Sequence, residues 1–375
     1  MSTAPAEAAL DRDEAFARIR LLRSPNIGPV SYGQLLRRFG TARAAIDALP
    51  DMAARGGTRY RAAPEARIEA EIAAVRKAGA RYLFHDAPAY PPLLAATDSA
   101  PPILIVRGQG ALAARPAVAM VGARNASAAA VRLSRDFAAG LAQAGFTVVS
   151  GLARGIDGAA HEGALAAGGG GTIGVIASGI DVTYPPEHRA LQERVASEGL
   201  LLAEQPPGTE PLARHFPSRN RIIAGIAAGT LVVEAAPKSG SLITARLAGE
   251  YGREVMAIPG SPLDSRSHGC NQLIRDGAVL VQAVEDVIEL LSGFDGHPRS
   301  TFREAAPEPL SWGEDEPGAE PADIAGLLTT APVSVDEIIR QSGQAPAAVQ
   351  LALLELEIAG RLERHAAGRV SLARG

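Results

Sequence analysis

Short apolar runs separated by helical segments between residues 76 and 293 constrain the fold of this chain more than any other feature of its sequence. Several runs are rich in valine and isoleucine and lack the polar alternation of a half-solvated strand. The runs are Tyr82–Phe84, Ile103–Val106, Ala117–Val121, Phe146–Val149, Thr172–Ala177, Leu200–Ala203, Leu231–Val233, Val255–Ile258 and Val279–Val281. Helical patterns between them cover 127–144, 155–167, 186–196, 220–228, 241–251 and 271–276. This alternation predicts an α/β core over 76–295 with a doubly wound, largely parallel sheet.

Residues 1–75 predict a small helical domain before this core. Its helical patterns cover 15–22, 32–39 and 42–49, and the turn Asn26-Ile27-Gly28-Pro29 resembles a helix-hairpin-helix turn. In that motif the turn amides and a helix N-terminus can hold a phosphate. Plain packing of the helices is the other interpretation. It is favoured, because a single glycine pattern is weak evidence for phosphate binding.

The C-terminal part of the chain predicts a linker over 296–321 and a winged-helix-like domain over 322–375. The linker is acidic and rich in proline, a composition typical of solvated segments. In the domain, Ser334 caps a helix over 335–340, a longer helix covers 346–359, and a basic hairpin-like tail covers 361–372. The longer helix has no basic residue and carries Glu355 and Glu357, so it is a poor reader of DNA. Protein docking or packing suits it better.

Charge and cysteine content limit the classes of function. The 375 residues contain 37 Lys and Arg against 41 Asp and Glu, a net charge of -4, so any anion must be held by a local site. The single cysteine, Cys270, excludes an internal disulfide framework and fits a reducing compartment. Acidic residues near the N-terminus argue against a signal peptide, and no uninterrupted apolar stretch reaches about 18 residues. We therefore expect a cytoplasmic protein without membrane insertion.

Glycine and serine recur directly after the predicted strands, together with three basic residues. The relevant positions are Gly122, Arg124 and Ser127, then Ser150, Gly151 and Arg154, then Lys238, Ser239, Gly240 and Ser241. The carboxyl ends of parallel strands meet at one edge of a sheet, where helix N-termini present free amides to anions. Any one such turn is typical of a tight strand-to-helix connection. Their repetition at one edge predicts an anion-binding site.

Signatures of common cofactor and metal sites are missing. No G-x-G-x-x-G follows the run Ala117–Val121, because Arg124 occupies the position of the second glycine. A G-x-x-x-x-G-K-[ST] phosphate loop and a G-x-S-x-G nucleophile elbow are also absent. His161-Glu162 lacks the second histidine of a zinc protease. The sequence predicts no cofactor, no metal site and no catalytic residue.

The segment ARHFPSRNRIIAG, residues 213–225, is the strongest indication of the ligand. It contains Arg214, Arg219 and Arg221 without an acidic residue, and Phe216 lies among them. A guanidinium pairs with phosphate through two hydrogen bonds, and a neighbouring ring can stack on a base. This combination suits a single strand of nucleic acid. The alternative is that Phe216 fills the core beside the turn at Pro217.

Several separated motifs resemble one family. They are VGAR at 121–124, SGLARGID at 150–157 with Ala160-His161, Tyr184-Pro185, FPSRNRIIAG at 216–225, VEA at 233–235, KSGSLITA at 238–245, Pro259-Gly260 and GCNQLI at 269–274. Together they resemble the DNA-processing protein A family, DprA or Smf, over about 120–282. The resemblance implies an extended Rossmann-like core that binds single-stranded DNA, protects incoming DNA, forms homodimers and loads RecA during natural transformation. It implies no enzymatic activity.

The resemblance also implies which residues contact DNA. Carried over by position, they are Gly122, Arg124, Ser127, Ser150, Gly151, Arg154, Phe216, Asn220, Arg221, Lys238, Ser239, Gly240 and Ser241. The four basic residues among them would bind phosphates, Phe216 would contact a base, and the glycines and serines would bind backbone oxygens. Asn220 and Glu234 could instead hold the loops of the site in place.

Two other functions remain open on the sequence alone. Rossmann-like nucleotide hydrolases also gather arginine and glutamate beyond strand ends, usually with a P-G-G-x-G-T turn. Here Pro259-Gly260 continues as Ser261-Pro262, which departs from that turn. A structural adaptor with a vestigial pocket is the second alternative. Release of a base from nucleoside monophosphates would favour the hydrolase.

Overall fold

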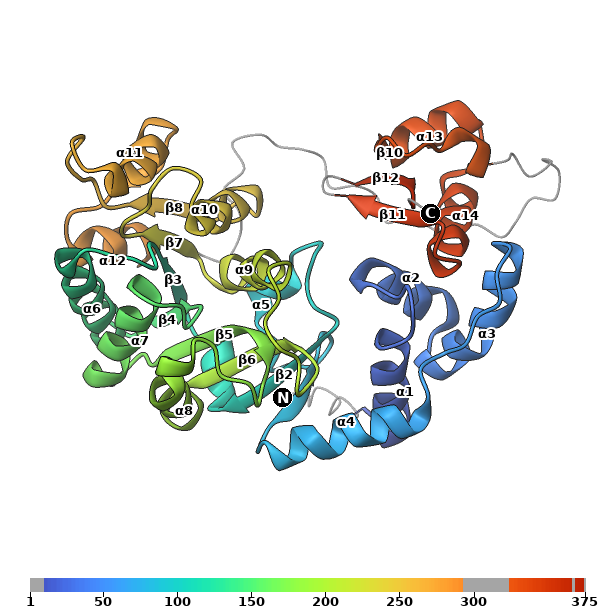
Figure 1. The fold of residues 1–375 in the computed structure, drawn as a ribbon, viewed down its shortest axis with the longest axis horizontal. Coiled ribbons are helices and arrows are strands. Elements are labelled where there is room, and N and C mark those ends of the chain that lie inside the picture. The colour runs from blue at the N-terminus through green and yellow to red at the C-terminus, as the bar shows by residue number, and fades with distance from the viewer. Residues whose placement is uncertain (1–9, 293–323, 366–367, 374–375) are drawn as a thin grey trace, which may run out of the picture. The chain divides into compact units, whose positions relative to one another are not determined.

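The computed structural model describes residues 10–292, 324–365 and 368–373 (Figure 1). The linker predicted over 296–321 therefore lies wholly outside the described residues. Contacts divide the chain into two compact units, one formed by Met1–Glu69 with Arg303–Gly375 and the other by Ala70–Phe302. Within the ranges described, no helix combines the length and the apolar character needed to cross a bilayer.

The unit Ala70–Phe302 is built on a nine-stranded sheet with the order β1-β2-β6-β5-β4-β3-β7-β8-β9. Its strands are β1 (Arg81–Phe84), β2 (Ile103–Gly108), β3 (Ala117–Val121), β4 (Thr147–Ser150), β5 (Thr172–Gly179), β6 (Leu200–Gln205), β7 (Gly229–Val232), β8 (Glu254–Ala257) and β9 (Val279–Leu280). Every predicted apolar run forms a strand. From β6 to β9 all neighbours are parallel, whereas β2 is antiparallel to both β6 and β1. The sheet is thus doubly wound with a mixed edge.

Helices cover both faces of this sheet (Figure 1). One face packs against α6 (Ala128–Gln143), α7 (Ile156–Ala167) and α12 (Val284–Ser292), and the other against α9 (His215–Ile226), α10 (Gly240–Glu250) and α11 (His268–Arg275). Successive residues of β3 alternate between the two cores: Val118 and Met120 enter one, and Ala119 and Val121 enter the other. Both faces are apolar because both are buried, which explains the runs without polar alternation.

Further elements complete this unit. They are residues 70–77 of α4 (Glu65–Lys77), together with α5 (Pro92–Ala95), α8 (Arg189–Glu198), η1 (Gly110–Ala114), η2 (Pro186–His188) and η3 (Ser265–Ser267). The helices α4 and α12 were not anticipated from the sequence. The helix α9 begins at His215 and not at Asn220 as predicted, so Phe216 lies in its first turn. Pro217 is tolerated there because the first-turn amides of a helix have no intrahelical acceptor.

The order of the strands creates a switch point at the carboxyl end of β3. From β3 the chain passes through β4, β5 and β6, which all lie on one side of β3 within the sheet. The helix α9 then leads the chain to β7, on the other side of β3, from which it continues to β8 and β9. Helices that leave neighbouring strands in opposite directions open a crevice between them, and open α/β sheets bind their ligands there.

The N-terminal helical domain contains α1 (Arg12–Leu22), α2 (Pro29–Phe39) and α3 (Ala42–Arg55), which pack around a core that includes Leu35 and Leu49. In the predicted hairpin turn, the Gly28 amide donates to Ser31 Oγ at 2.9 Å and the Ile27 amide donates to the Ser24 carbonyl. These two donors of the turn are thus satisfied within the domain. The observation favours the packing interpretation of the turn.

The C-terminal domain has a winged-helix architecture. Its elements are η4 (Ile324–Leu327), β10 (Val333–Ser334), α13 (Val335–Ser342), α14 (Pro346–Ile358), β11 (Leu362–His365) and β12 (Arg369–Leu372). The strands form a three-stranded sheet in the order β10-β12-β11. As predicted, Ser334 caps α13, and its hydroxyl accepts a hydrogen bond from the Glu337 amide at 3.2 Å.

Candidate functional site

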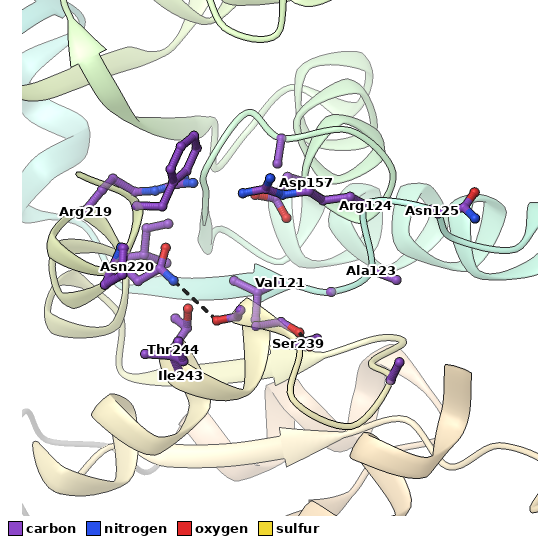
Figure 2. Close-up of a pocket in the computed structure, with 18 of the residues that line it drawn as sticks. Val121, Ala123, Arg124, Asn125, Asp157, Arg219, Asn220, Ser239, Ile243 and Thr244 are labelled. Atoms are coloured by element: carbon purple, nitrogen blue, oxygen red, sulfur yellow. Dashed lines mark hydrogen bonds between the residues drawn. The ribbon is translucent and has the colours of Figure 1, made fainter. Parts of the chain in front are cut away.

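A pocket of about 630 Å³ lies at the switch point of the sheet (Figure 2). The segments after β3, β4 and β7 form its walls together with α9 and the start of α10. Its lining includes Gly122, Arg124, Asp157, Phe216, Arg219, Asn220, Ser239, Gly240, Ser241, Thr244 and Arg266. Seven of these were expected at the site from the sequence: Gly122, Arg124, Phe216, Asn220, Ser239, Gly240 and Ser241.

One wall of the pocket combines a cation with an aromatic ring, which packs against a second ring. The guanidinium carbon of Arg124 lies 4.9 Å from the centroid of the Phe216 ring. The ring of Tyr184 meets Phe216 edge-on, with centroids 5.6 Å apart. Phe216 is half-buried, and the hydrophobic cores found among the described residues do not include it. Its ring therefore faces the pocket, which argues against the core-filling alternative.

A buried arginine lies beside this wall. Arg219 is only 5% exposed, its Nη1 donates to the Val175 carbonyl at 3.0 Å, and its Nε has no hydrogen-bond partner. Burial lowers the pKa of Arg219 to about 10, against the opposing attraction of Asp157, so the group remains charged at neutral pH. Burial likewise raises the pKa of Asp157, whose Oδ2 accepts from the Gly151 amide at 3.1 Å. The pocket thus has a fixed positive charge in its lining.

Arg219 was seen in the arginine-rich segment but was not expected at the site, whereas Arg221 was. The structure reverses these positions. Phe216, Arg219 and Asn220 are spaced at i, i+3 and i+4 and share one face of α9. Arg221 lies on another face, is 15% exposed, and pairs with Glu204 and the Ser99 carbonyl. Arg221 therefore does not line this pocket, and its contact with a phosphate stays a prediction.

Two expected glycines serve the packing of the pocket. A Cβ on Gly151 would lie 1.4 Å from Nη1 of Arg219. A Cβ on Gly122 would lie 2.6 Å from Ile156 Cγ1 and 2.9 Å from the Glu234 carbonyl. The resemblance implied that these glycines bind backbone oxygens of DNA. In the structure the nearest groups that require them belong to the protein itself.

The turn before α10 contributes polar groups and a helix N-terminus to the pocket. Ser239 is the N-cap residue, and its Oγ lies 2.5 Å from Oγ of Ser241. Asn220 donates from Nδ2 to the Gly240 carbonyl at 3.3 Å, so it connects α9 to the start of α10. This contact fits the alternative in which Asn220 holds the loops of the site in place. A Cβ on Gly240 would meet no atom within 4 Å. The start of α10 is therefore open to an anionic ligand.

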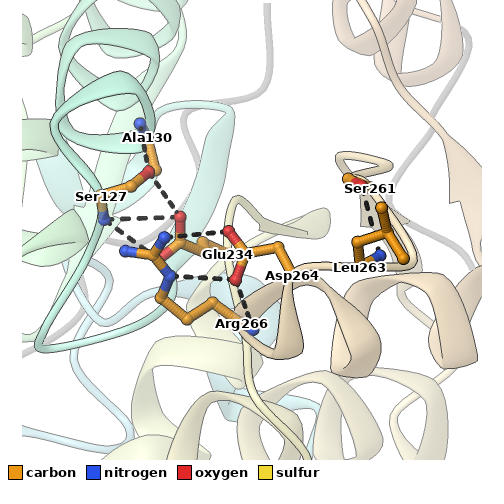
Figure 3. A network of polar contacts seen from close by, with 7 residues as sticks. All are labelled: Ser127, Ala130, Glu234, Ser261, Leu263, Asp264 and Arg266. Carbon is orange, nitrogen blue, oxygen red and sulfur yellow. Dashed lines mark hydrogen bonds and ion pairs between the residues drawn. The ribbon is translucent and has the colours of Figure 1, made fainter.

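Ser127 acts as a helix cap and not as a free hydroxyl (Figure 3). Its Oγ accepts from the Ala130 amide at 3.1 Å and donates to Glu234 Oε2 at 2.7 Å. The Ser127 amide also donates to Glu234 Oε1 at 3.1 Å. Glu234 thereby holds the loop after β3, the second role that the sequence allowed for it. Arg266 pairs with Asp264 at 2.9 Å beside this network and lines the pocket.

Three other expected residues lie outside the lining of this pocket. Ser150 is buried and donates from Oγ to the Met120 carbonyl at 2.6 Å. Arg154 is exposed and forms an ion pair with Glu187. Lys238 directly precedes Ser239 in the sequence, but it lines a neighbouring pocket of about 540 Å³. Of the four cations expected at one rim, Arg124 lines this pocket and Lys238 lines the neighbouring one, whereas Arg154 and Arg221 line neither of the two.

A buried histidine supports the loop between β4 and α7. The Leu152 amide donates to His161 Nε2 at 3.3 Å, and His161 Nδ1 lies 2.8 Å from Thr172 Oγ1. Because Thr172 donates its own proton to the Val148 carbonyl, this arrangement fits a neutral ring with the proton on Nδ1. Burial lowers the pKa of His161 to about 3. The histidine appeared in a sequence motif, but its supporting role required the tertiary contacts.

The described residues contain no group of three or more His, Cys, Asp and Glu side chains placed to hold a metal ion. The pocket lining instead offers guanidinium groups, hydroxyls, a helix N-terminus and an aromatic ring. These groups bind phosphate oxygens and flat apolar surfaces. The fold and site therefore define a class of α/β protein with a pocket of guanidinium and hydroxyl groups at the carboxyl edge of its sheet.

Family models match all three parts of the chain. The model described as DNA recombination-mediator protein A matches residues 81–292, the DprA-like N-terminal HHH domain matches 12–74, and the DprA winged helix domain matches 304–368. The chain belongs to the DNA processing protein A family, DprA/Smf. The fold of the core and the winged helix expected from the sequence are thereby confirmed.

Relatives extend over most of the chain. Protein Smf of Escherichia coli is 38% identical over 323 residues, covering 85% of each protein. DNA processing protein DprA of Streptococcus pneumoniae is 47% identical over 199 residues, covering 53% of this chain and 70% of that protein. The solved structure of the pneumococcal protein matches with a TM-score of 0.62 at 37% identity, covering 74% of this chain and 96% of that one.

A second solved structure concerns a ligand. It is described as showing the single-stranded DNA binding mode of DNA processing protein A from Helicobacter pylori. It matches with a TM-score of 0.51 at 29% identity, covering 57% of this chain and 95% of that one.

Proposed function

We propose that this protein binds single-stranded DNA in the pocket at the switch point of its central sheet. The observation that carries the proposal is the ring of Phe216, which has Arg124 over it and lines the same pocket as Arg219. An aromatic face binds any base by stacking, and the guanidinium groups attract the phosphates beside it. Because the whole chain has a net charge of -4, this local site must supply the attraction for a polyanion.

Single strands fit this site better than duplexes. A volume of about 630 Å³ can receive a base and its phosphate only if the base is free of its stack and its pairing partner. A rigid duplex would present its phosphates without placing a base on Phe216. The Helicobacter pylori relative, which binds single-stranded DNA as its description states, supports the same ligand class.

The family likeness supports a role in natural transformation and DNA recombination, in which the bound strand is protected and RecA is loaded onto it. We propose this role without a catalytic step. Buried titratable groups near the pocket have structural partners: Asp157 accepts from the Gly151 amide, and both ring nitrogens of His161 are engaged. With a pKa near 3, His161 is a poor general base at neutral pH.

We further propose that two copies of the chain associate, in the cytoplasm, through the edge of the sheet formed by β9. The exposed fractions of Val279 and Leu280 are 36% and 45%. An edge strand with exposed apolar side chains offers unpaired backbone groups and an apolar surface to a second copy. Sedimentation of Leu280→Glu should show a monomer where the natural sequence shows a dimer. A monomeric natural protein would reject this contact.

One titration tests the main proposal. Fluorescence anisotropy with a labelled single-stranded oligonucleotide should give saturable binding, and a duplex of the same sequence should compete weakly. A gel shift with purified RecA should then show more RecA on the oligonucleotide when this protein is present. Equal affinity for both forms would contradict the pocket as the binding site. Release of bases from nucleoside monophosphates would favour the hydrolase alternative.

A further inference from the structure

The helix α14 of the winged-helix domain has two apolar faces. Val349, Leu353 and Leu356 enter the core of the winged helix itself. Leu354 and Ile358 are 3% and 1% exposed and belong to a different cluster, built mainly by the N-terminal helical domain, against which Leu351 also packs. Leu351, Leu354 and Ile358 are spaced at i, i+3 and i+7, so they share a second stripe. A helix that is apolar on two faces requires a partner on each of them.

Polar contacts surround the apolar contact between α14 and the N-terminal helical domain, within one compact unit of the chain. Asn26 donates from Nδ2 to the Ile358 carbonyl at 3.1 Å, Gln34 donates to Gln350 at 3.1 Å, Arg55 pairs with Glu355 at 2.6 Å, and Arg361 donates to the Gly56 carbonyl at 3.2 Å. Asn26 begins the hairpin turn in which a phosphate could have been held. The contact therefore involves both this turn and α14, the helix in the place of a recognition helix.

Gly56 shows that the two surfaces fit closely. It ends α3 at φ -75° and ψ 0°, a conformation that any L residue can adopt. A Cβ at this position would lie 2.6 Å from Ala359 Cβ and 2.8 Å from the Glu355 carbonyl. The lack of a side chain is thus required by the contact with the winged helix and not by the backbone of α3. A larger residue should disturb the contact while α3 keeps its fold.

From these observations we infer that α14 is a docking surface for the N-terminal helical domain of the same chain, and not a reader of DNA. The absence of basic residues between Pro346 and Ile358 follows from this role, because one face is buried in each domain. While docked, neither α14 nor the turn that begins at Asn26 contacts the DNA strand. The docking contact stands independently of the proposed function, and only its consequence for DNA rests on that function.

Hydrogen exchange on the full-length chain tests the docking with Gly56→Ala. Overpacking of this kind should make opening of the contact about tenfold more frequent, with faster exchange in residues 351–359 and 52–57. Exchange in the central sheet should stay unchanged. The matched control is Gly33→Ala, because a Cβ there meets only Arg37 Nη1 at 3.7 Å. Unchanged exchange at α14 in Gly56→Ala would overturn the docking.

Exchanging the charges of the ion pair between Arg55 and Glu355 gives a second test, which stays decisive if Gly56→Ala also disturbs the fold of α3. Arg55→Glu and Glu355→Arg should each speed exchange at α14, and the double variant should restore protection. Additive effects without restoration would overturn the role of this pair in docking. A saturating oligonucleotide should protect the central pocket and leave α14 unchanged. New protection at α14 would reject the inference about DNA, whereas no binding anywhere would reject the proposed function and leave the docking result standing.

Discussion

Replacing Phe216 by alanine tests whether its ring stacks on a base. Stacking of one base on an aromatic side chain contributes about 1–3 kcal/mol, so the single-strand affinity of Phe216→Ala should fall about 5- to 150-fold. The ring is half-buried and lies outside the described hydrophobic cores, so the loss of unfolding free energy should stay well below the roughly 3–5 kcal/mol of a core phenylalanine. Affinity should therefore fall while thermal stability is largely kept.

The salt dependence of binding separates the ring from its neighbouring cation. Phe216→Ala removes no charge, so the slope of log affinity against log salt should not change. Arg124→Ala should lower the magnitude of that slope by about 0.7, since one phosphate contact is lost from a single strand. The two side chains touch, with 4.9 Å from the guanidinium carbon to the ring centroid. The double variant should consequently lose less than the sum of the two single losses.

Fluorescence anisotropy over a series of salt concentrations measures the single-strand affinity and its salt slope. Thermal unfolding of each variant measures stability alongside. Phe39→Ala is a matched control, because Phe39 is also half-buried and also carries an arginine, Arg38, 5.9 Å from its ring centroid. It lies in the N-terminal helical domain and should leave DNA affinity unchanged. Unaltered affinity of Phe216→Ala, or equal losses in both phenylalanine variants, would refute the stacking argument.

Three further substitutions test the support of the pocket. Gly151→Ala places a Cβ 1.4 Å from Nη1 of Arg219, so we expect a loss of about 1–3 kcal/mol of unfolding free energy together with weaker DNA binding; an unchanged melting temperature would show that the loop has room. Arg221→Ala leaves Glu204 without its partner and should lower the melting temperature without changing the salt slope, whereas a slope reduced by about 0.7 would place Arg221 on the strand. The pKa of His161 is about 3 when folded and about 6.5 when unfolded, so between these values only the unfolded chain binds the proton. Stability should therefore fall as the pH drops below about 6.5, and His161→Gln should lack this contribution in urea unfolding at pH 7, 5 and 4; identical pH dependence of both proteins would contradict the assignment.

The periodicity and turn residues of the chain were sufficient to predict most of its architecture. Apolar runs without alternation marked the strands because parallel strands are buried on both faces. Ser334 marked the start of α13, since its hydroxyl can satisfy an amide that has no intrahelical acceptor. Gly122 and Ser239 marked the loops at the carboxyl edge of the sheet, and both loops line the pocket. These features depend on residues close together in the sequence.

The tertiary structure decided which cations share the pocket and which partners hold the others. Arg219 and Arg221 look equivalent in the sequence, but they lie on different faces of α9, and only burial against Val175 directs Arg219 to the pocket. The partner of Arg221, Glu204, comes from β6, and the partner of Leu354 on α14 comes from a domain some 300 residues earlier in the chain. Sequence patterns report short-range periodicity, whereas such pairings arise when strand register and packing bring distant segments together.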